Sequence, residues 1–89
     1  MKVMIVEDNF LMRLTIKEFL IELGHEVISE TVNAEAALKA FVELEPEAVF
    51  LDLILPGKSG LEILDDIRKI NKDAKITKEL NGYSPSTLK

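Results

Sequence analysis

Two short apolar runs in this chain each end in acidic side chains, and this feature constrains the fold more than any other. Val3-Met4-Ile5-Val6 is followed by Glu7 and Asp8, and Ala48-Val49-Phe50-Leu51 is followed by Asp52. Because apolar and polar residues do not alternate in either run, both faces of each strand should be buried, as in a parallel sheet. The carboxyl ends of parallel strands meet at one edge of the sheet, so we expect the three carboxylates to gather there.

The composition fits one small folded domain. The chain has 89 residues, of which 47% are hydrophobic and 30% charged, a balance typical of globular proteins. It contains no cysteine, which excludes disulfides, thiolate zinc sites and cysteine nucleophiles. No apolar stretch approaches the ~20 residues that span a bilayer, so we expect a soluble protein without membrane contact. The absence of cysteine suits a reducing compartment, so we expect the cytoplasm. The formal net charge of -5, without a concentrated basic patch, argues against direct binding of nucleic acid.

The apolar runs alternate with helical patterns, which predicts an α/β fold. Gly24 is expected to stop the first helix, and Asn33 and Ser59 are expected to cap the second and third. A possible fourth strand begins at Ala74-Lys75-Ile76, after which residues 77–89 carry no strong helix or strand signal. The predicted strands are residues 2–6, 25–29 and 48–52, and the predicted helices are residues 9–23, 34–44 and 60–70.

The predicted first helix is apolar on two sides. One stripe recurs at spacings of four, three and four residues and is expected to face the sheet. The other lies nearly opposite at ~100° per residue, where a solvent-facing surface should be polar. Its side chains are either tolerated exposed residues or contacts for the tail or another subunit. The first stripe is Met12, Ile16, Phe19 and Leu23, and the second is Phe10, Leu14 and Ile21.

Each acidic residue has a structural alternative to a role in a site. Asp8 could cap the first helix, which is a common role for aspartate. Glu7 could be an ordinary solvated residue. Asp52 ends a buried strand and has no obvious packing purpose. If the three acids do cluster, they repel one another, and a divalent cation would relieve that repulsion.

Taken in order, these motifs resemble the receiver domain of bacterial response regulators. The resemblance covers residues 2 to about 76, and its longest segment runs from Ala48 through Asp-x-x-x-Pro-Gly-x-x-Gly, which ends at Gly60. It implies a partial doubly wound, flavodoxin-like parallel sheet with strand order 2-1-3 and a possible fourth strand. It also implies a receiver-like domain over residues 1–76 that lacks the family's last units, followed by an atypical tail over residues 77–89. The other matching segments are residues 3–9, 24–27 and 33–38.

The resemblance implies a role for each acidic residue. Asp52 would be the phosphoacceptor, a carboxylate nucleophile that takes a phosphoryl group from a histidine kinase or phosphotransfer protein. Asp8 would bind Mg²⁺ directly beside Asp52, and Glu7 would act mostly through a metal-bound water. The backbone carbonyl of Ile54 would supply another oxygen. Pro56 and Gly57 would shape the loop after Asp52, Lys58 would be a solvated cation, and Gly60 would let the third helix begin close to the site.

Other activities fit the sequence less well. Dehalogenase-type phosphohydrolases need a second aspartate two residues after the first, and that position is Ile54 here. No basic recognition helix follows that would indicate a DNA-binding regulator. His25 is expected to be a half-buried turn residue. The resemblance instead implies a signalling module that is not an enzyme in its own right.

The chain departs from the family pattern after residue 76. The family carries Thr or Ser at the end of its fourth strand and Lys at the end of its fifth. The nearest hydroxyl residues are Thr77 and Ser84 and the nearest cations are Lys75, Lys78 and Lys89, and none has a matching context. The alternative function is therefore a truncated receiver that acts as an interaction or dimerisation module without productive phosphorylation. Because the missing last helix would leave the first helix uncovered, we also expect a homodimer, with exchange of the tail between subunits as one form of it.

Overall fold

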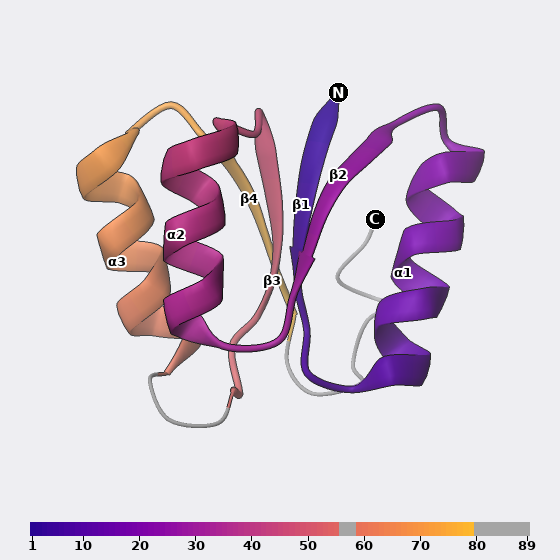
Figure 1. The fold of residues 1–89 in the computed structure, drawn as a ribbon, viewed down its shortest axis with the longest axis horizontal. Helices are drawn as coiled ribbons and strands as arrows, with labels where there is room; N and C mark the ends of the chain where they lie inside the picture. Colours follow the sequence, from indigo (N-terminus) through magenta and orange to yellow (C-terminus); the bar gives the residue numbers. More distant parts are fainter. Residues whose placement is uncertain (56–58, 80–89) are drawn as a thin grey trace.

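A four-stranded parallel sheet forms the centre of the molecule, with strand order β2-β1-β3-β4 (Figure 1). The computed structural model describes residues 1–55 and 59–79. The predicted α/β class and the order 2-1-3 are confirmed, and the possible fourth strand is present. The strands are β1 (Lys2–Val6), β2 (Glu26–Thr31), β3 (Ala48–Asp52) and β4 (Lys75–Glu79), and the helices are α1 (Phe10–Glu22), α2 (Ala34–Leu44) and α3 (Gly60–Ile70).

The helices cover the two faces of the sheet unequally. Helices α2 and α3 pack on one face, and α1 covers the other (Figure 1). Successive residues of β1 and β3 point into different cores, which is why their sequences do not alternate between apolar and polar. The core under α2 and α3 includes Met4, Val6, Val49, Leu51, Phe41, Ile63 and Ile67. The smaller core under α1 consists of Val3, Ile5, Phe50, Ile16 and Leu20.

Each helix begins at a side chain that caps its first turn. Asn9, Asn33 and Ser59 accept hydrogen bonds from backbone N–H groups three residues further on, at 2.9, 2.9 and 3.3 Å. The caps at Asn33 and Ser59 were predicted. Because Asn9 caps α1, the alternative that Asp8 fills this position is wrong. Gly24 follows the end of α1 with a φ of 91°, the left-handed conformation that glycine tolerates best.

The apolar stripe predicted to face the sheet from α1 is partly wrong. Ile16 and Leu20 are the buried side chains and Met12 is half-buried, whereas Phe19 is 39% and Leu23 58% exposed. The helix is therefore rotated about its axis relative to the predicted orientation, because two apolar sides leave the rotation undecided by pattern alone. The side chains of the second stripe, Phe10, Leu14 and Ile21, are all exposed.

Strand β4 continues through Glu79, beyond the point where the sequence pattern weakens. It pairs with β3 from Lys75 opposite Ala48 to Glu79 opposite Asp52, so it covers the outer edge of β3. Ile76 packs against the core under α2 and α3. A polar sequence forms a strand here because pairing with β3 outweighs the weak intrinsic preference. The division of the chain at residue 76 stays a prediction, and the tail over residues 80–89 lies outside the described residues.

Candidate functional site

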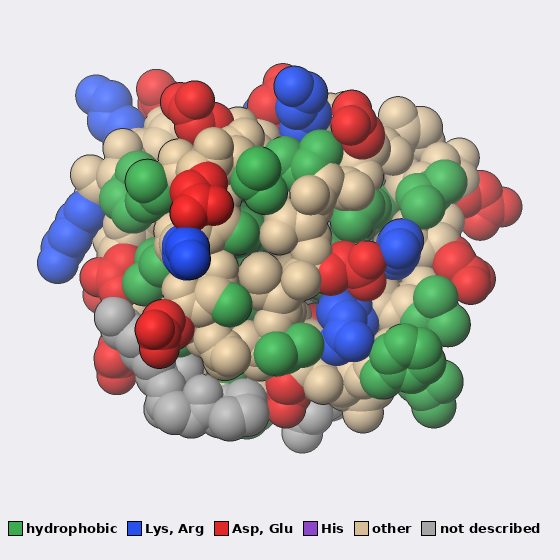
Figure 2. Space-filling view, viewed as in Figure 1, with side chains coloured by type: hydrophobic (Ala, Val, Ile, Leu, Met, Phe, Trp, Pro, Cys, Tyr) green, Lys and Arg blue, Asp and Glu red, His purple; other side chains and the backbone are tan. Residues whose placement is uncertain are grey.

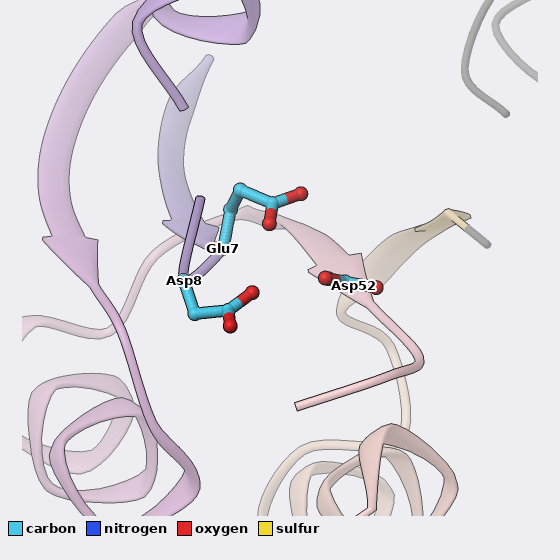
Figure 3. Close-up of side chains that lie close together, drawn as sticks. All are labelled: Glu7, Asp8 and Asp52. Carbon is cyan, nitrogen blue, oxygen red and sulfur yellow. The ribbon is translucent and has the colours of Figure 1, made fainter. Parts of the chain in front are cut away.

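Glu7, Asp8 and Asp52 lie together at the carboxyl edge of the sheet, and we name this group the acidic pocket. Glu7 and Asp8 directly follow β1, and Asp52 is the last residue of β3. One carboxylate oxygen from each residue lies within 4.8 Å of the others. Figure 3 shows the Glu7 and Asp8 side chains reaching from the end of β1 across to Asp52. The predicted clustering of the three acids is confirmed.

The acidic pocket combines two buried carboxylates with an exposed one. Glu7 and Asp52 are each only 2% exposed, whereas Asp8 is exposed. The burial of Glu7 contradicts the alternative that it is an ordinary solvated residue. Carboxylates that are buried near one another lose hydration and repel, so the pocket is costly to fold unless a cation offsets its charge. The exposed Asp8 gives such a cation access from solvent.

Hydrogen bonds on both sides fix the backbone of Glu7. Its N–H donates to the carbonyl oxygen of Thr31 at 3.0 Å, at the end of β2. Its carbonyl oxygen accepts from Nη1 of Arg13 at 2.9 Å, and its Oε2 accepts from the N–H of Asn9 at 3.1 Å. Sequence reasoning did not identify Arg13, since a single arginine in an otherwise apolar helix start is a weak signal. The contact shows that α1 helps to hold the acidic pocket.

The loop after β3 and the start of α3 hold Asp52. Its Oδ1 accepts from the N–H of Ile54 at 2.9 Å, which forms a local turn. The N–H of Gly60 donates to the carbonyl oxygen of Leu53 at 3.1 Å. A Cβ added at Gly60 would lie 2.3 Å from Leu53 Cα and 2.6 Å from the Asp52 carbonyl oxygen. Only glycine therefore lets α3 begin this close to the site, as predicted, while the predicted roles of residues 56–58 lie outside the described residues.

In the part of the chain that the structure describes, β4 brings neither a hydroxyl residue nor a lysine into register with Asp52. Thr77 pairs with Phe50, two residues earlier along β3. Lys75 lies at the start of β4, at the opposite edge of the sheet from the acidic pocket. The residue in register with Asp52 is Glu79. Lys78 is exposed opposite Leu51, and the remaining candidates, Ser84 and Lys89, lie outside the described residues.

The donor set of the acidic pocket suits magnesium. All three side chains offer oxygen, the ligand atom that Mg²⁺ prefers, and their spacing within 4.8 Å lets them share one ion. A magnesium site takes only a few carboxylates and retains several waters, which the exposed side of Asp8 accommodates. The backbone carbonyl of Ile54 as a further ligand stays a prediction.

Comparisons with known sequences point to one family. The family model of the response regulator receiver domain matches residues 3–78. The chemotaxis protein CheY of Thermotoga maritima is 35% identical over 75 residues, which cover 84% of this chain and 62% of the relative. The chemotaxis protein CheY of Bacillus subtilis is 33% identical over the same shares. The chain thus spans 62% of the length of these relatives.

Solved structures agree with the sequence matches. The response regulator TrrA of Thermotoga maritima, solved in complex with Mg(2+)-BeF, has a TM-score of 0.84 and 41% identity, covering 93% of this chain and 70% of that chain. A LuxR-family two-component response regulator from Aurantimonas has a TM-score of 0.84 and 29% identity, covering 89% of this chain and 57% of that chain. With its sheet order and its match over residues 3–78, the chain belongs to the response regulator receiver domain family of two-component systems.

Proposed function

We propose that this chain accepts a phosphoryl group on Asp52 from a histidine kinase or a phosphotransfer protein, with Mg²⁺ in the acidic pocket. The observation that carries the proposal is the buried Asp52 carboxylate, which lies within 4.8 Å of oxygens of Glu7 and Asp8 at the carboxyl edge of the sheet. Membership of the receiver family supports it. The site is proposed to work in the cytoplasm, and no helix within residues 1–55 and 59–79 has the length and apolarity to cross a bilayer.

Asp52 acts as the nucleophile of the transfer. One of its carboxylate oxygens attacks the phosphorus of a phosphohistidine, and an O–P bond forms as the P–N bond breaks. The electron pair of the broken bond leaves with the imidazole nitrogen, and Asp52 becomes an aspartyl phosphate. The hydrogen bond from the Ile54 N–H to Oδ1 fixes the orientation of the carboxylate. Because Oδ1 accepts this hydrogen bond, we assign the attack to the other oxygen, Oδ2, which the fixed carboxylate presents in a defined direction.

The other two acids hold the cation that the transfer needs. In this proposal Asp8 and Asp52 would hold Mg²⁺ directly, Glu7 would act mostly through a water, and the Ile54 carbonyl would add an oxygen. When bound, Mg²⁺ neutralises charge on the phosphoryl group and removes the repulsion among the carboxylates. The Glu7 side chain is buried in the pocket, while the exposed Asp8 remains accessible to the ion. The metal-free pocket is therefore a poor phosphoacceptor.

The proposal includes a homodimer, as the exposed apolar side of α1 suggests. Phe10 is 64% exposed, and Leu14 and Ile21 lie on the same side of the helix. Figure 2 shows hydrophobic side chains gathered over the lower end of α1. A second copy that packs on this side would remove them from water. Light scattering after size-exclusion chromatography should give the mass of a dimer, and a stable monomer at micromolar concentration would contradict this part of the proposal.

Intact mass after treatment with a small phosphodonor and Mg²⁺ tests the phosphorylation. The wild type should gain the mass of one phosphoryl group, and Asp52→Asn should gain none. Asp65→Asn, which changes an exposed aspartate on α3, is the matched control and should behave as the wild type. Addition of a chelator should prevent the gain in the wild type. No gain in the wild type with Mg²⁺ would contradict the proposal and favour a module that interacts without phosphorylation.

A further inference from the structure

The guanidinium of Arg13 connects three elements beside the acidic pocket. The Arg13 side chain is only 17% exposed. Its Nη1 donates to the Glu7 carbonyl oxygen at 2.9 Å, just after β1, and its Nε lies 3.6 Å from Oε1 of Glu30 in β2. The guanidinium carbon also lies 5.6 Å from the centroid of the Phe10 ring, within the range of a cation–π contact. One side chain therefore fixes α1 against the ends of β1 and β2.

The carbonyl that Arg13 holds belongs to the peptide unit between two acids of the pocket. This planar unit joins Glu7 to Asp8, so its orientation sets the directions in which both side chains leave the backbone. The N–H of Glu7 is already bound to Thr31 on the preceding side. With the carbonyl bound to Arg13, the Glu7 backbone is held at both of its polar groups. Arg13 thus holds the peptide unit from which the Glu7 and Asp8 side chains branch.

Glu30 keeps the positive charge of Arg13 beside the backbone. Its two carboxylate oxygens are shared, because Oε1 faces Arg13 at 3.6 Å and Oε2 accepts from Nζ of Lys17 at 2.9 Å. An arginine that reached into the acidic pocket would neutralise the carboxylates itself and compete with a cation. Its pairing with Glu30 retains Arg13 at the rim, where it binds a neutral carbonyl and leaves the carboxylates for a metal.

We propose that Arg13 is a positioning residue for the magnesium site, which fixes the Glu7–Asp8 peptide so that both carboxylates face Asp52 before an ion binds. The inference rests on the proposed function, because it takes Mg²⁺ as the ligand of the acidic pocket. Ligands that are already ordered lose less conformational freedom when the ion binds, so the affinity is higher. Loss of a residue that orients metal ligands typically weakens metal binding about 10- to 100-fold.

Arg68 provides a matched control. Its Nη1 donates to the backbone carbonyls of Lys72 and Ala74 at 3.1 and 2.6 Å. Like Arg13, it lies on a helix and holds a segment next to a strand of the same sheet. Ala74 directly precedes β4, so this contact is at the opposite edge of the sheet from the acidic pocket. Its removal should affect stability without affecting the metal site.

Isothermal titration of the metal-free chain with MgCl2 tests the inference. We expect Arg13→Gln to raise the Kd for Mg²⁺ by about tenfold or more, and Arg68→Gln to leave it unchanged. Arg13→Lys should recover part of the affinity, because an ammonium also donates to a carbonyl but lacks the planar fork. Both Gln variants should lower the midpoint of thermal unfolding. An unchanged Kd in Arg13→Gln, or an equal rise in Arg68→Gln, would overturn the inference.

A second measurement needs no metal. Hydrogen exchange of the Asn9 amide, which donates to Glu7 Oε2, reports the order of this segment in the metal-free chain. We expect faster exchange in Arg13→Gln and no change in Arg68→Gln, and equal exchange in all three proteins would contradict a positioning role. A wild type that binds no Mg²⁺ would overturn the proposed metal site, and the exchange rates would still decide whether Arg13 orders the segment. The absence of a metal site and the absence of an ordering role for Arg13 thus give different results.

Discussion

Strands β1 and β3 are buried both in their interiors and at their carboxyl ends. The effect of burial on stability is opposite in these two regions. Val6 and Leu51 are 0% exposed, and the acids that follow them, Glu7 and Asp52, are each 2% exposed. Burial of the apolar side chains stabilises the fold because it removes them from water. Burial of the carboxylates costs free energy because it removes their hydration and brings like charges together. The sheet thus changes from a stabilising core to a functional site within one residue of each strand.

The substitution Asp52→Asn should affect function and stability in opposite directions, and it should have the largest effect. Phosphorylation should be abolished, because an amide is not a nucleophile for phosphoryl transfer. At the same time the free energy of unfolding in chelator should rise by about 1 kcal/mol, since one of the clustered charges is lost. Urea unfolding and intact mass on the same sample check both effects. A variant less stable than the wild type would show that the buried carboxylate stabilises the fold and would contradict this expectation.

A substitution in the core should lower stability without changing the metal site. Ile67→Ala removes a fully buried side chain of the core under α2 and α3 and should lower the free energy of unfolding by about 3 kcal/mol. For a domain of this size that is a large part of the total stability. The milder Ile67→Val should cost about 1 kcal/mol and leave the Kd for Mg²⁺ unchanged. A change in that Kd, measured by titration calorimetry, would show that core packing and the site are not separate.

Gly60→Ala tests the boundary between the regions. The added methyl group would overlap the backbone at Leu53 and Asp52, so α3 must move away from the site. We expect a loss of about 2 kcal/mol in stability together with slower phosphorylation. Gly24→Ala is the control, because its positive φ strains alanine but no atom lies within 4 Å of the new Cβ. It should lower stability without changing the phosphorylation rate, and an equal change in rate would contradict a local effect at Gly60.

Addition of Mg²⁺ should reduce the cost of the buried carboxylates. At a free concentration ten times the Kd, the wild type should gain about 1.4 kcal/mol in free energy of unfolding. Asp8→Asn should gain much less, because it lacks the exposed ligand. Thermal unfolding with and without MgCl2, compared with NaCl at equal ionic strength, measures the effect. Equal gains in both proteins would indicate general ionic screening instead of a site.

The features that the sequence predicts are those determined by residues close to one another in the sequence. The strands at residues 2–6 and 48–52 are recognisable as apolar runs, and the acidic pocket follows from the ends of those runs. The strand at Thr77–Glu79 was missed, because a polar edge strand owes its conformation to pairing with β3. The rotation of α1 was missed because both of its sides are apolar. Arg13 was missed because its partners, Glu7 and Glu30, are brought to it only by the folded sheet.

The close approach of Gly60 has a mechanical consequence. The main chain at the start of α3 touches the main chain at Asp52 and Leu53, with no side chain between them. A displacement of the Asp52 backbone would therefore be transmitted directly to the start of α3. The backbones at position 60 and at the end of β3 therefore cannot shift independently of each other.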